Sequence, residues 1–244
     1  MVCVWFLFQE RNNLMIFKQF FDNLSSTYTY LISSGKGREA LIIDPVIENT
    51  SEYLKALTNL DLKLVKVIDT HIHTDHISGL NELSKKTNCT KIMGEQSVSE
   101  IIDIKVKDND KVNIENLELQ AIYTPGHTDC SYSFLMNDRV FTGDTLLINS
   151  TGRTDFQNGN ALDQYNSIFK RLLKLPVNTL VYPAHDYNGK QYSTIGNEKN
   201  NNPRLQVSSP EEYVEIMNNL KLSNPKMMDV AVPANIKGLT LDKI

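Results

Sequence analysis

The sequence predicts an α/β domain in which two β-sheets pack between outer helices. Strand-like segments fall in two runs along the chain, helix-like segments lie between and after these runs, and no linker or internal repeat divides the chain. With 244 residues, 41% of them hydrophobic, the chain can bury the core of one such domain. We assign residues 15–244 to this domain and leave residues 1–14 as an N-terminal extension that need not be structured.

The first run of predicted strands forms an antiparallel meander. Its members are rich in β-branched and aromatic residues and are separated by turn-forming residues. These strands cover residues 15–21, 26–33 and 39–45. A helix is predicted over residues 50–60, where Thr and Ser precede apolar residues at helical spacing. The next strand, residues 62–69, runs directly into a cluster of histidines.

The second run of predicted strands follows a helix over residues 77–87. Its strand segments cover residues 117–124, 131–143 and 180–183. Two further helices are predicted over residues 160–174 and 210–220, and the second of these begins with a proline. Helices between and after the strands are therefore expected to cover the outer faces of both sheets.

Charge and composition exclude several classes of partner. The chain has 29 Asp and Glu against 25 Lys and Arg, and the resulting net charge of −4 argues against a nucleic acid. No apolar run reaches the ~18 to 20 residues that a membrane span needs. Three scattered cysteines form neither a disulfide framework nor a Cys-X-X-Cys zinc site. We expect a small-molecule partner and a reducing, cytoplasmic location.

The histidines carry the strongest functional signal. The chain has five, and each lies on a loop after an apolar strand-like segment. The segment THIHTDH, residues 70–76, holds three of them and one aspartate. Because alternating positions point to opposite sides of the loop, His71 and His73 can face one metal position. Asp75 and His76 then face a neighbouring position or support the ligands.

Single candidate ligands follow later in the chain. Each comes directly after Gly or Pro-Ala, and small residues let the backbone turn sharply toward a shared centre. They are His127, Asp144 and His185. Any one of the histidines alone would be an ordinary hydrogen-bonded residue, but the placement of all five predicts a metal site.

The pattern HxHxDH followed by single His, Asp and His resembles that of the metallo-β-lactamase superfamily. This resemblance covers residues ~15 to 200 and implies an αββα sandwich of two mixed sheets flanked by helices, with a metal site at one edge. The segments GDTLLINSTGRTDFQ, YPAHDYNG, NPRL and AVPAN resemble the persulfide dioxygenases, the ethylmalonic encephalopathy protein family, and extend the similarity from Met15 to Gly238. That family implies oxidation of glutathione persulfide with O2 and water to sulfite and glutathione at one Fe(II) per chain.

The resemblance also implies which residues hold the iron. His71, His127 and Asp144 would be the ligands and the catalytic residues. Two histidines and one carboxylate leave one face of an octahedron open, where the persulfide sulfur and O2 would lie side by side. The residues that would orient these ligands are His73, Asp75, His76 and His185.

Three residues are candidates for contacts to glutathione. Arg153 is the first, because a guanidinium matches a carboxylate in bidentate geometry, and an ion pair with Asp155 is its alternative role. Tyr187 would donate its hydroxyl, or else be an ordinary half-buried core tyrosine. Lys237 stands where the family usually has an arginine, so this contact is expected to be weaker.

A glyoxalase-II-like hydroxyacylglutathione hydrolase with two zinc or iron ions is the alternative. Its metals would be held by His71, His73 and His127 on one side, by Asp75, His76 and His185 on the other, and by Asp144 as the bridge. The short C-terminal stretch argues against it, because such thioesterases carry a longer helical substrate domain. The resemblance implies the mitochondrial matrix if the organism is eukaryotic, and it leaves open a homodimer and a rhodanese that supplies or uses the substrate.

Overall fold

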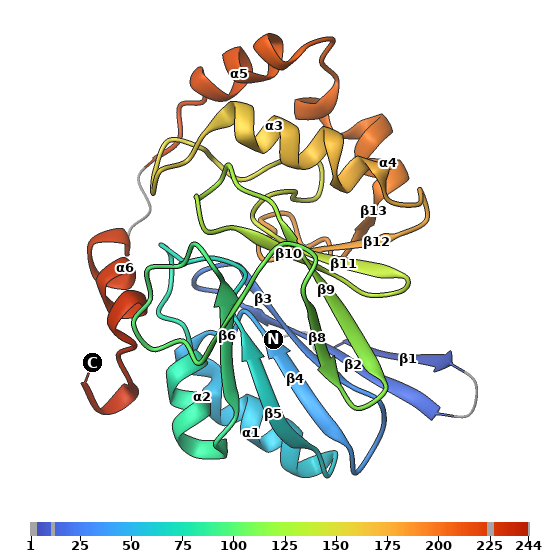
Figure 1. Ribbon diagram of the computed structural model, residues 1–244, viewed down its shortest axis with the longest axis vertical. Coiled ribbons are helices and arrows are strands. Elements are labelled where there is room, and N and C mark those ends of the chain that lie inside the picture. Colours follow the sequence, from blue (N-terminus) through green and yellow to red (C-terminus); the bar gives the residue numbers. More distant parts are fainter. Residues whose placement is uncertain (1–3, 11–12, 224–226, 244) are drawn as a thin grey trace.

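The computed structural model describes residues 4–10, 13–223 and 227–243 and shows two β-sheets between outer helices (Figure 1). Each sheet contains parallel and antiparallel neighbours, so both are mixed. The αββα sandwich is therefore confirmed. None of the helices in the described part of the chain combines the length and the apolar composition needed to span a lipid bilayer.

The N-terminal sheet has the strand order β1-β2-β3-β4-β5-β6-β7. Its strands are β1 (Val4–Glu10), β2 (Asn13–Asp22), β3 (Thr27–Ser33), β4 (Glu39–Ile43), β5 (Lys63–Ile68), β6 (Thr90–Gly94) and β7 (Ile104–Val106). Strands β2 to β4 form the predicted antiparallel meander, and β4 to β7 run parallel. Strand β1 lies in the extension that we left outside the fold. It pairs antiparallel with β2, because an apolar, aromatic segment with high strand propensity meets an available sheet edge.

The second sheet has the order β13-β12-β11-β10-β9-β8. Its strands are β8 (Lys111–Ile114), β9 (Leu117–Tyr123), β10 (Tyr132–Leu135), β11 (Arg139–Gly143), β12 (Leu180–Pro183) and β13 (Ser193–Thr194). The predicted segment 131–143 is a hairpin of β10 and β11, and β12 joins β11 in parallel. Sequence analysis did not predict β6, β7, β8 or β13, which have two to five residues each.

The α-helices cover the outer faces of the sheets and one side of the molecule (Figure 1). They are α1 (Thr50–Asn59), α2 (Leu80–Thr87), α3 (Ala161–Lys170), α4 (Ile195–Asn201), α5 (Pro210–Asn218) and α6 (Met228–Lys237). Short 3-10 helices cover Ile47–Asn49, Leu172–Lys174, Pro203–Leu205 and Leu241–Lys243. Asn160 caps α3 by accepting from two backbone N–H groups, and Ser209 caps α5 ahead of its proline.

Apolar side chains fill the space between the sheets and the space under the helices. Between the sheets, the rings of Phe17 and Tyr182 lie 4.9 Å apart, as do those of Tyr30 and Phe141. A second cluster packs α1 and α2 onto the N-terminal sheet, and a third packs α3 and α5 onto the other sheet. Each large side chain buried in this way contributes about 1.5–3 kcal/mol, so the strands form a rigid support for the loops at their ends.

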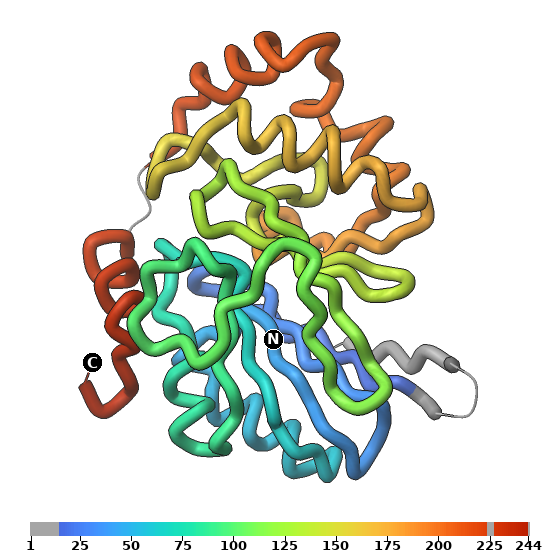
Figure 2. Tube along the Cα trace, in the orientation of Figure 1, coloured from blue at the N-terminus to red at the C-terminus, as the bar shows by residue number. Residues whose placement is uncertain are grey.

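The C-terminal segment returns to the N-terminal half of the chain. Figure 2 shows α6, in red, lying beside the green and cyan segments that follow β5 and β6. Asn235 of α6 donates to the carbonyl groups of His73 and His76 and accepts from the backbone N–H of Ser78. The loop that carries HxHxDH is thus held from outside by a helix about 160 residues further along the chain.

Candidate metal centre

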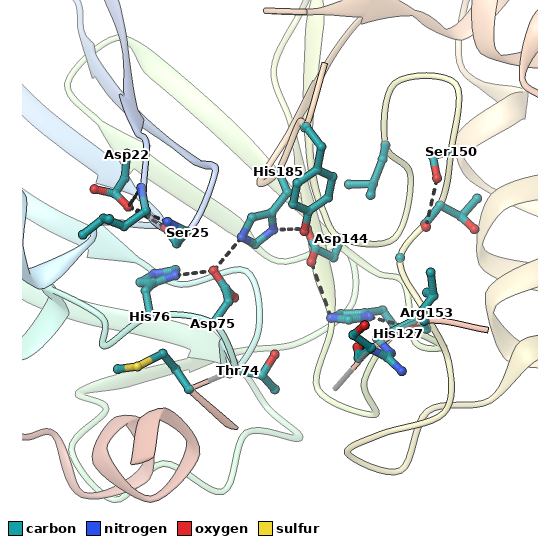
Figure 3. Close-up of a pocket in the computed structure, with 18 of the residues that line it drawn as sticks. Asp22, Ser25, Thr74, Asp75, His76, His127, Asp144, Ser150, Arg153 and His185 are labelled. Carbon is teal, nitrogen blue, oxygen red and sulfur yellow. Dashed lines mark hydrogen bonds and ion pairs between the residues drawn. The ribbon is translucent and has the colours of Figure 1, made fainter. Parts of the chain in front are cut away.

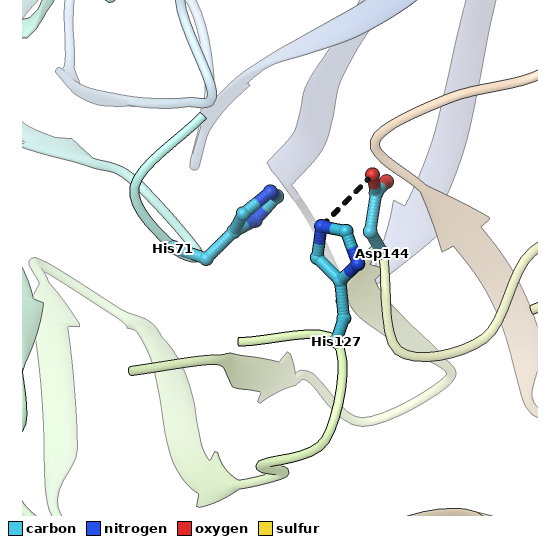
Figure 4. A group of neighbouring side chains, drawn as sticks. All are labelled: His71, His127 and Asp144. Atoms are coloured by element: carbon cyan, nitrogen blue, oxygen red, sulfur yellow. Dashed lines mark ion pairs between the residues drawn. The ribbon is translucent and has the colours of Figure 1, made fainter. Parts of the chain in front are cut away.

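Loops after three strands bring His71, His127 and Asp144 together (Figure 4). His71 follows β5, His127 follows β9 and Asp144 follows β11 directly. One ligand atom from each of the three lies within 4.8 Å of the others, and all three residues are buried. His127 Nε2 is 3.6 Å from Asp144 Oδ2. Such a group of two imidazoles and one carboxylate is suited to hold one divalent metal ion.

The hydrogen bonds around both histidines favour metal binding through Nε2. His127 donates from Nδ1 to the carbonyl oxygen of Arg153 at 2.7 Å. His71 Nδ1 lies 3.0 Å from the hydroxyl of Thr70, which in turn donates to Asp44 Oδ2 at 3.0 Å. Because the Thr70 proton is used in that bond, Thr70 accepts from His71 Nδ1–H. Each imidazole therefore keeps the lone pair of Nε2 for a metal, and the two nitrogens with the Asp144 carboxylate fit one divalent metal ion.

The charge states of these residues also suit a metal. Burial lowers the pKa of His71 well below its ordinary value, so its imidazole is neutral. Burial raises the pKa of Asp44 to about 6, which leaves this carboxylate ionised at neutral pH. Burial alone would raise the pKa of Asp144 as well, but the charge of His185 and its hydrogen bond hold it well below the usual range. Neutral imidazoles and an ionised carboxylate are the forms that bind metal.

His185 links two carboxylates (Figure 3). Its Nδ1 donates to Asp144 Oδ1 at 2.7 Å and its Nε2 donates to Asp75 Oδ2 at 2.8 Å. Burial alone would lower the pKa of His185, but the two carboxylates raise it well above its ordinary value. His76 Nδ1 lies 3.0 Å from the same oxygen of Asp75. In this arrangement His185 is an imidazolium that fixes the orientation of Asp144.

His73, Asp75 and His76 form a second group whose ligand atoms lie within 4.8 Å of one another. His73 Nε2 lies 3.2 Å from Asp44 Oδ1. His73 Nδ1 and His76 Nε2 are buried and have no hydrogen-bond partner among the described residues. The two alternatives from the sequence analysis therefore both remain: these nitrogens could bind a second metal ion, or their residues could orient the ligands of the first.

A cavity of about 720 Å³ opens onto His127, Asp144 and His185. Arg153 and Tyr187, two of the candidate glutathione contacts, line it, and their contact with substrate stays a prediction. Tyr187 is 71% exposed, and its ring is parallel to that of His185. Lys237 is not among the described residues that line the cavity, since it is exposed at the last position of α6.

Arg153 makes the ion pair that was its alternative role. Its Nε and Nη2 donate to the two carboxylate oxygens of Asp155 at 2.6 and 2.7 Å. Its Nη1 donates to the carbonyl oxygen of Ser223 at 2.6 Å, and its guanidinium lies over the ring of Phe156. These contacts hold the loop whose carbonyl group orients His127.

Sequence analysis missed several residues that shape the site. They are Asp44, Thr70, Asn235 and Arg204, of which Arg204 lines the cavity. Thr70 directly precedes the candidate ligand His71, and Asp44 directly follows β4. No feature of the sequence around them indicates that they form a chain of hydrogen bonds to His71. Asn235 and Arg204 lie inside AVPAN and NPRL, and those two segments were the available signal.

The relay from Asp44 to His71 predicts the effect of removing one hydroxyl. Thr70→Val keeps the shape of the side chain but leaves His71 Nδ1–H and Asp44 without their shared partner. We expect metal affinity to fall by about 10- to 100-fold, as is typical for partners of metal ligands. Thr70→Ser, which keeps the hydroxyl, is the control and should bind metal normally. Metal titration of the two variants tests this, and equal affinities would contradict it.

Comparison with known proteins places this site in a family. Residues 22–103 and 100–185 match the family described as the Metallo-beta-lactamase superfamily. The crystal structure of ETHE1 from Myxococcus xanthus superposes with a TM-score of 0.89 and 48% identity, covering 91% of this chain and 98% of that one. Persulfide dioxygenase ETHE1 of Mus musculus is 40% identical over 91% of this chain and 88% of its own length. The chain belongs to the persulfide dioxygenase family of the metallo-β-lactamase superfamily.

Membership in this family confirms the resemblance to persulfide dioxygenases that was seen in the sequence. A hydroxyacylglutathione hydrolase of Dictyostelium discoideum is also similar, at 32% identity over 73% of this chain and 69% of its own length. Its lower identity and coverage agree with its place as the alternative. Membership in the persulfide dioxygenase family and the grouped histidines and aspartate together support a metal cofactor.

Proposed function

We propose that the protein oxidises glutathione persulfide with O2 and water to sulfite and glutathione, using one Fe(II) per chain. The observation that carries the proposal is the group of His71, His127 and Asp144 in a chain that belongs to the persulfide dioxygenase family. In this reaction the outer sulfur gives up the electrons that O2 takes up. The S–S bond breaks, the outer sulfur leaves as sulfite with its three oxygen atoms drawn from O2 and water, and the inner sulfur takes up a proton to become the thiol of glutathione.

His71, His127 and Asp144 would hold the iron. Bound there, Fe(II) supplies an open coordination face and the ability to activate O2. The protein contributes the geometry: the Thr70 hydroxyl and the Arg153 carbonyl group fix the two imidazoles, and His185 fixes Asp144. Ligands that cannot rotate keep the reacting groups in one arrangement, which lowers the entropic part of the barrier.

The cavity would hold the substrate above this group. Asp144, His127 and His185 lie on its wall, so a persulfide placed in the cavity brings its sulfur next to the ligands. The predicted homodimer and rhodanese partner stay predictions. The mouse relative is named as a mitochondrial protein, and the compartment of this chain, cytoplasmic or mitochondrial, stays a prediction as well.

The proposed reaction predicts substrate-dependent oxygen consumption. Iron-loaded protein should consume O2 only when glutathione persulfide is supplied, with sulfite as the product, and an iron chelator should abolish the consumption. An oxygen electrode and sulfite determination measure this. A sample that takes up no O2 with glutathione persulfide but rapidly hydrolyses S-lactoylglutathione would refute the proposal.

A binuclear hydroxyacylglutathione hydrolase is the second candidate. The observation that favours it is the second group of His73, Asp75 and His76, in which two buried nitrogens have no hydrogen-bond partner within the described part of the chain. In the dioxygenase, by contrast, the same three residues would bind no metal and would orient the iron ligands. Elemental analysis of anaerobically purified protein separates the two, because the dioxygenase requires one iron per chain and the hydrolase requires two metals.

A further inference from the structure

The chain contains two Asn-Gly pairs, and the structure places them in different surroundings. Asn158–Gly159 lies in the loop before α3, and Asn188–Gly189 lies in the loop between β12 and β13. Both asparagines are exposed. In such a pair the glycine backbone nitrogen can attack the side-chain amide carbon of the asparagine, because glycine has no Cβ to hinder the approach. The two pairs are equivalent in sequence, so the fold decides which of them reacts.

At Asn158–Gly159 the attacking nitrogen is already engaged. The N–H group of Gly159 donates to the carbonyl oxygen of Phe156 at 2.7 Å. The side-chain amide of Asn158 donates to Asp129 Oδ2 at 2.9 Å. A Cβ at Gly159 would lie 2.5 Å from the carbonyl oxygen of Thr154, so the backbone is packed tightly here. Ring closure at this pair therefore requires the loop to open and to give up these contacts.

At Asn188–Gly189 the attacking nitrogen has no hydrogen-bond partner among the described residues. Gly189 is exposed, and a Cβ there would meet nothing within 4 Å, so water and a moving side chain have room around it. The N–H groups on either side, those of Asn188 and Lys190, donate to Asp186 Oδ2 at 2.8 and 2.7 Å. The loop is thus anchored next to Gly189 while the nitrogen that the reaction uses stays free.

We propose that Asn188 is a site of spontaneous deamidation in the folded protein and that Asn158 is protected from it. The Gly189 nitrogen forms a bond to the side-chain carbonyl carbon of Asn188 and loses its proton. The bond from that carbon to the amide nitrogen breaks, and ammonia leaves. Water then opens the resulting succinimide at either carbonyl group and yields aspartate or isoaspartate. No group is oxidised or reduced, and water is the only co-reactant.

The product changes the charge of a loop at the cavity. Tyr187, which precedes Asn188, lines the cavity, and its ring is parallel to that of His185. Deamidation adds a carboxylate two residues from Asp186, whose side chain anchors the loop through the N–H groups of Asn188 and Lys190. Like charges repel, and isoaspartate also adds a methylene group to the main chain. We therefore expect this loop to loosen in the deamidated protein.

The test is incubation of the folded, full-length protein at neutral pH in water enriched in heavy oxygen, followed by peptide mass spectrometry. Heavy oxygen marks each succinimide that opens during the incubation and so distinguishes it from deamidation during digestion. Asn188 should convert to aspartate and isoaspartate about tenfold or more faster than Asn158, because only Asn158 must first break a hydrogen bond and open its loop. In denaturant the two rates should agree within about threefold, since glycine follows both asparagines.

Two variants test the role of the free nitrogen. Gly189→Ala places a Cβ beside that nitrogen, so deamidation of Asn188 should slow by about tenfold or more while that of Asn158 is unchanged. Asn188→Gln, which could close only a larger and less favourable ring, should not convert, and it serves if Gly189→Ala is too unstable to assay.

Hydrogen exchange follows the consequence for the loop. Protection of the loop between β12 and β13 should fall as the unsubstituted protein ages and should stay constant in Asn188→Gln. Equal rates at Asn188 and Asn158 in the folded protein, or a faster rate at Asn158, overturn the proposal. None of these measurements involves a metal or a persulfide, so the result is independent of the proposed function.

Discussion

Replacing His71, His127 or Asp144 by alanine will remove the metal and abolish persulfide oxidation. These residues supply the group of ligand atoms within 4.8 Å, and a site with three protein ligands cannot spare one of them. Each variant should be purified anaerobically beside the unsubstituted protein, and its iron content and O2 uptake measured. Circular dichroism spectra should be unchanged, because the core between the sheets does not include these side chains.

His185→Ala provides the contrast to these variants. His185 fixes Asp144 and Asp75 by hydrogen bonds at 2.7 and 2.8 Å but does not belong to the group of three. The variant should keep most of its iron and lose activity by about 10- to 100-fold, as partners of metal ligands typically do. If His185→Ala loses metal as completely as His71→Ala, the mononuclear assignment is wrong and a binuclear site is the better account.

Gly152→Ala will disrupt the same centre through the backbone. A Cβ at this position would lie 2.1 Å from the carbonyl oxygen of Asp144 and 2.9 Å from Nδ1 of His127. Neither atom can move without shifting a ligand, because Gly152 N–H donates to that Asp144 carbonyl and His127 Nδ1 donates to Arg153. We expect loss of most bound metal and activity. Overpacking of this kind also lowers the free energy of unfolding by roughly 1–3 kcal/mol.

Gly189→Ala is the matched control for Gly152→Ala. Gly189 has a φ of +77°, but a Cβ there would meet nothing within 4 Å. The substitution should cost about 1 kcal/mol of stability from backbone strain and leave metal content unchanged. Iron analysis and thermal unfolding of both variants separate a collision at the ligands from a general loss of stability. Normal iron in Gly152→Ala would show that the loop can yield without moving His127.

Much of the fold could be predicted because its signals are local. The meander β2–β4 and the hairpin β10–β11 have β-branched and aromatic runs between clear turn residues. Strand β13 and helix α4 have two and seven residues, too few for a periodic pattern to emerge. Helix α6 contains a proline, which normally marks the end of a helix, and was missed for that reason.

By itself, the sequence determined the candidate ligands and the family. His71, His127 and Asp144 could be predicted from the sequence because a metal binds only certain side chains. Each of these three side chains follows a predicted strand, in the order that the motif requires. The same pattern, with the segments around it, indicated the persulfide dioxygenases. These signals lie in the identity of residues and in their order, and neither depends on knowing which loops meet.

Only the tertiary structure decided which groups hold the candidate ligands in place and which of the two arginines in the cavity wall forms an ion pair. The carbonyl group that orients His127 belongs to Arg153, and a backbone carbonyl has no signature in sequence because every residue has one. Whether a guanidinium is already paired depends on neighbours brought close by folding. Asp155 lies beside Arg153 in the chain and pairs with it, whereas Arg204 meets the Thr151 backbone and no acidic side chain in the described structure. The position of Lys237 also depended on the tertiary structure. The family resemblance predicted a substrate contact there, but Lys237 ends α6 and is not among the described residues that line the cavity.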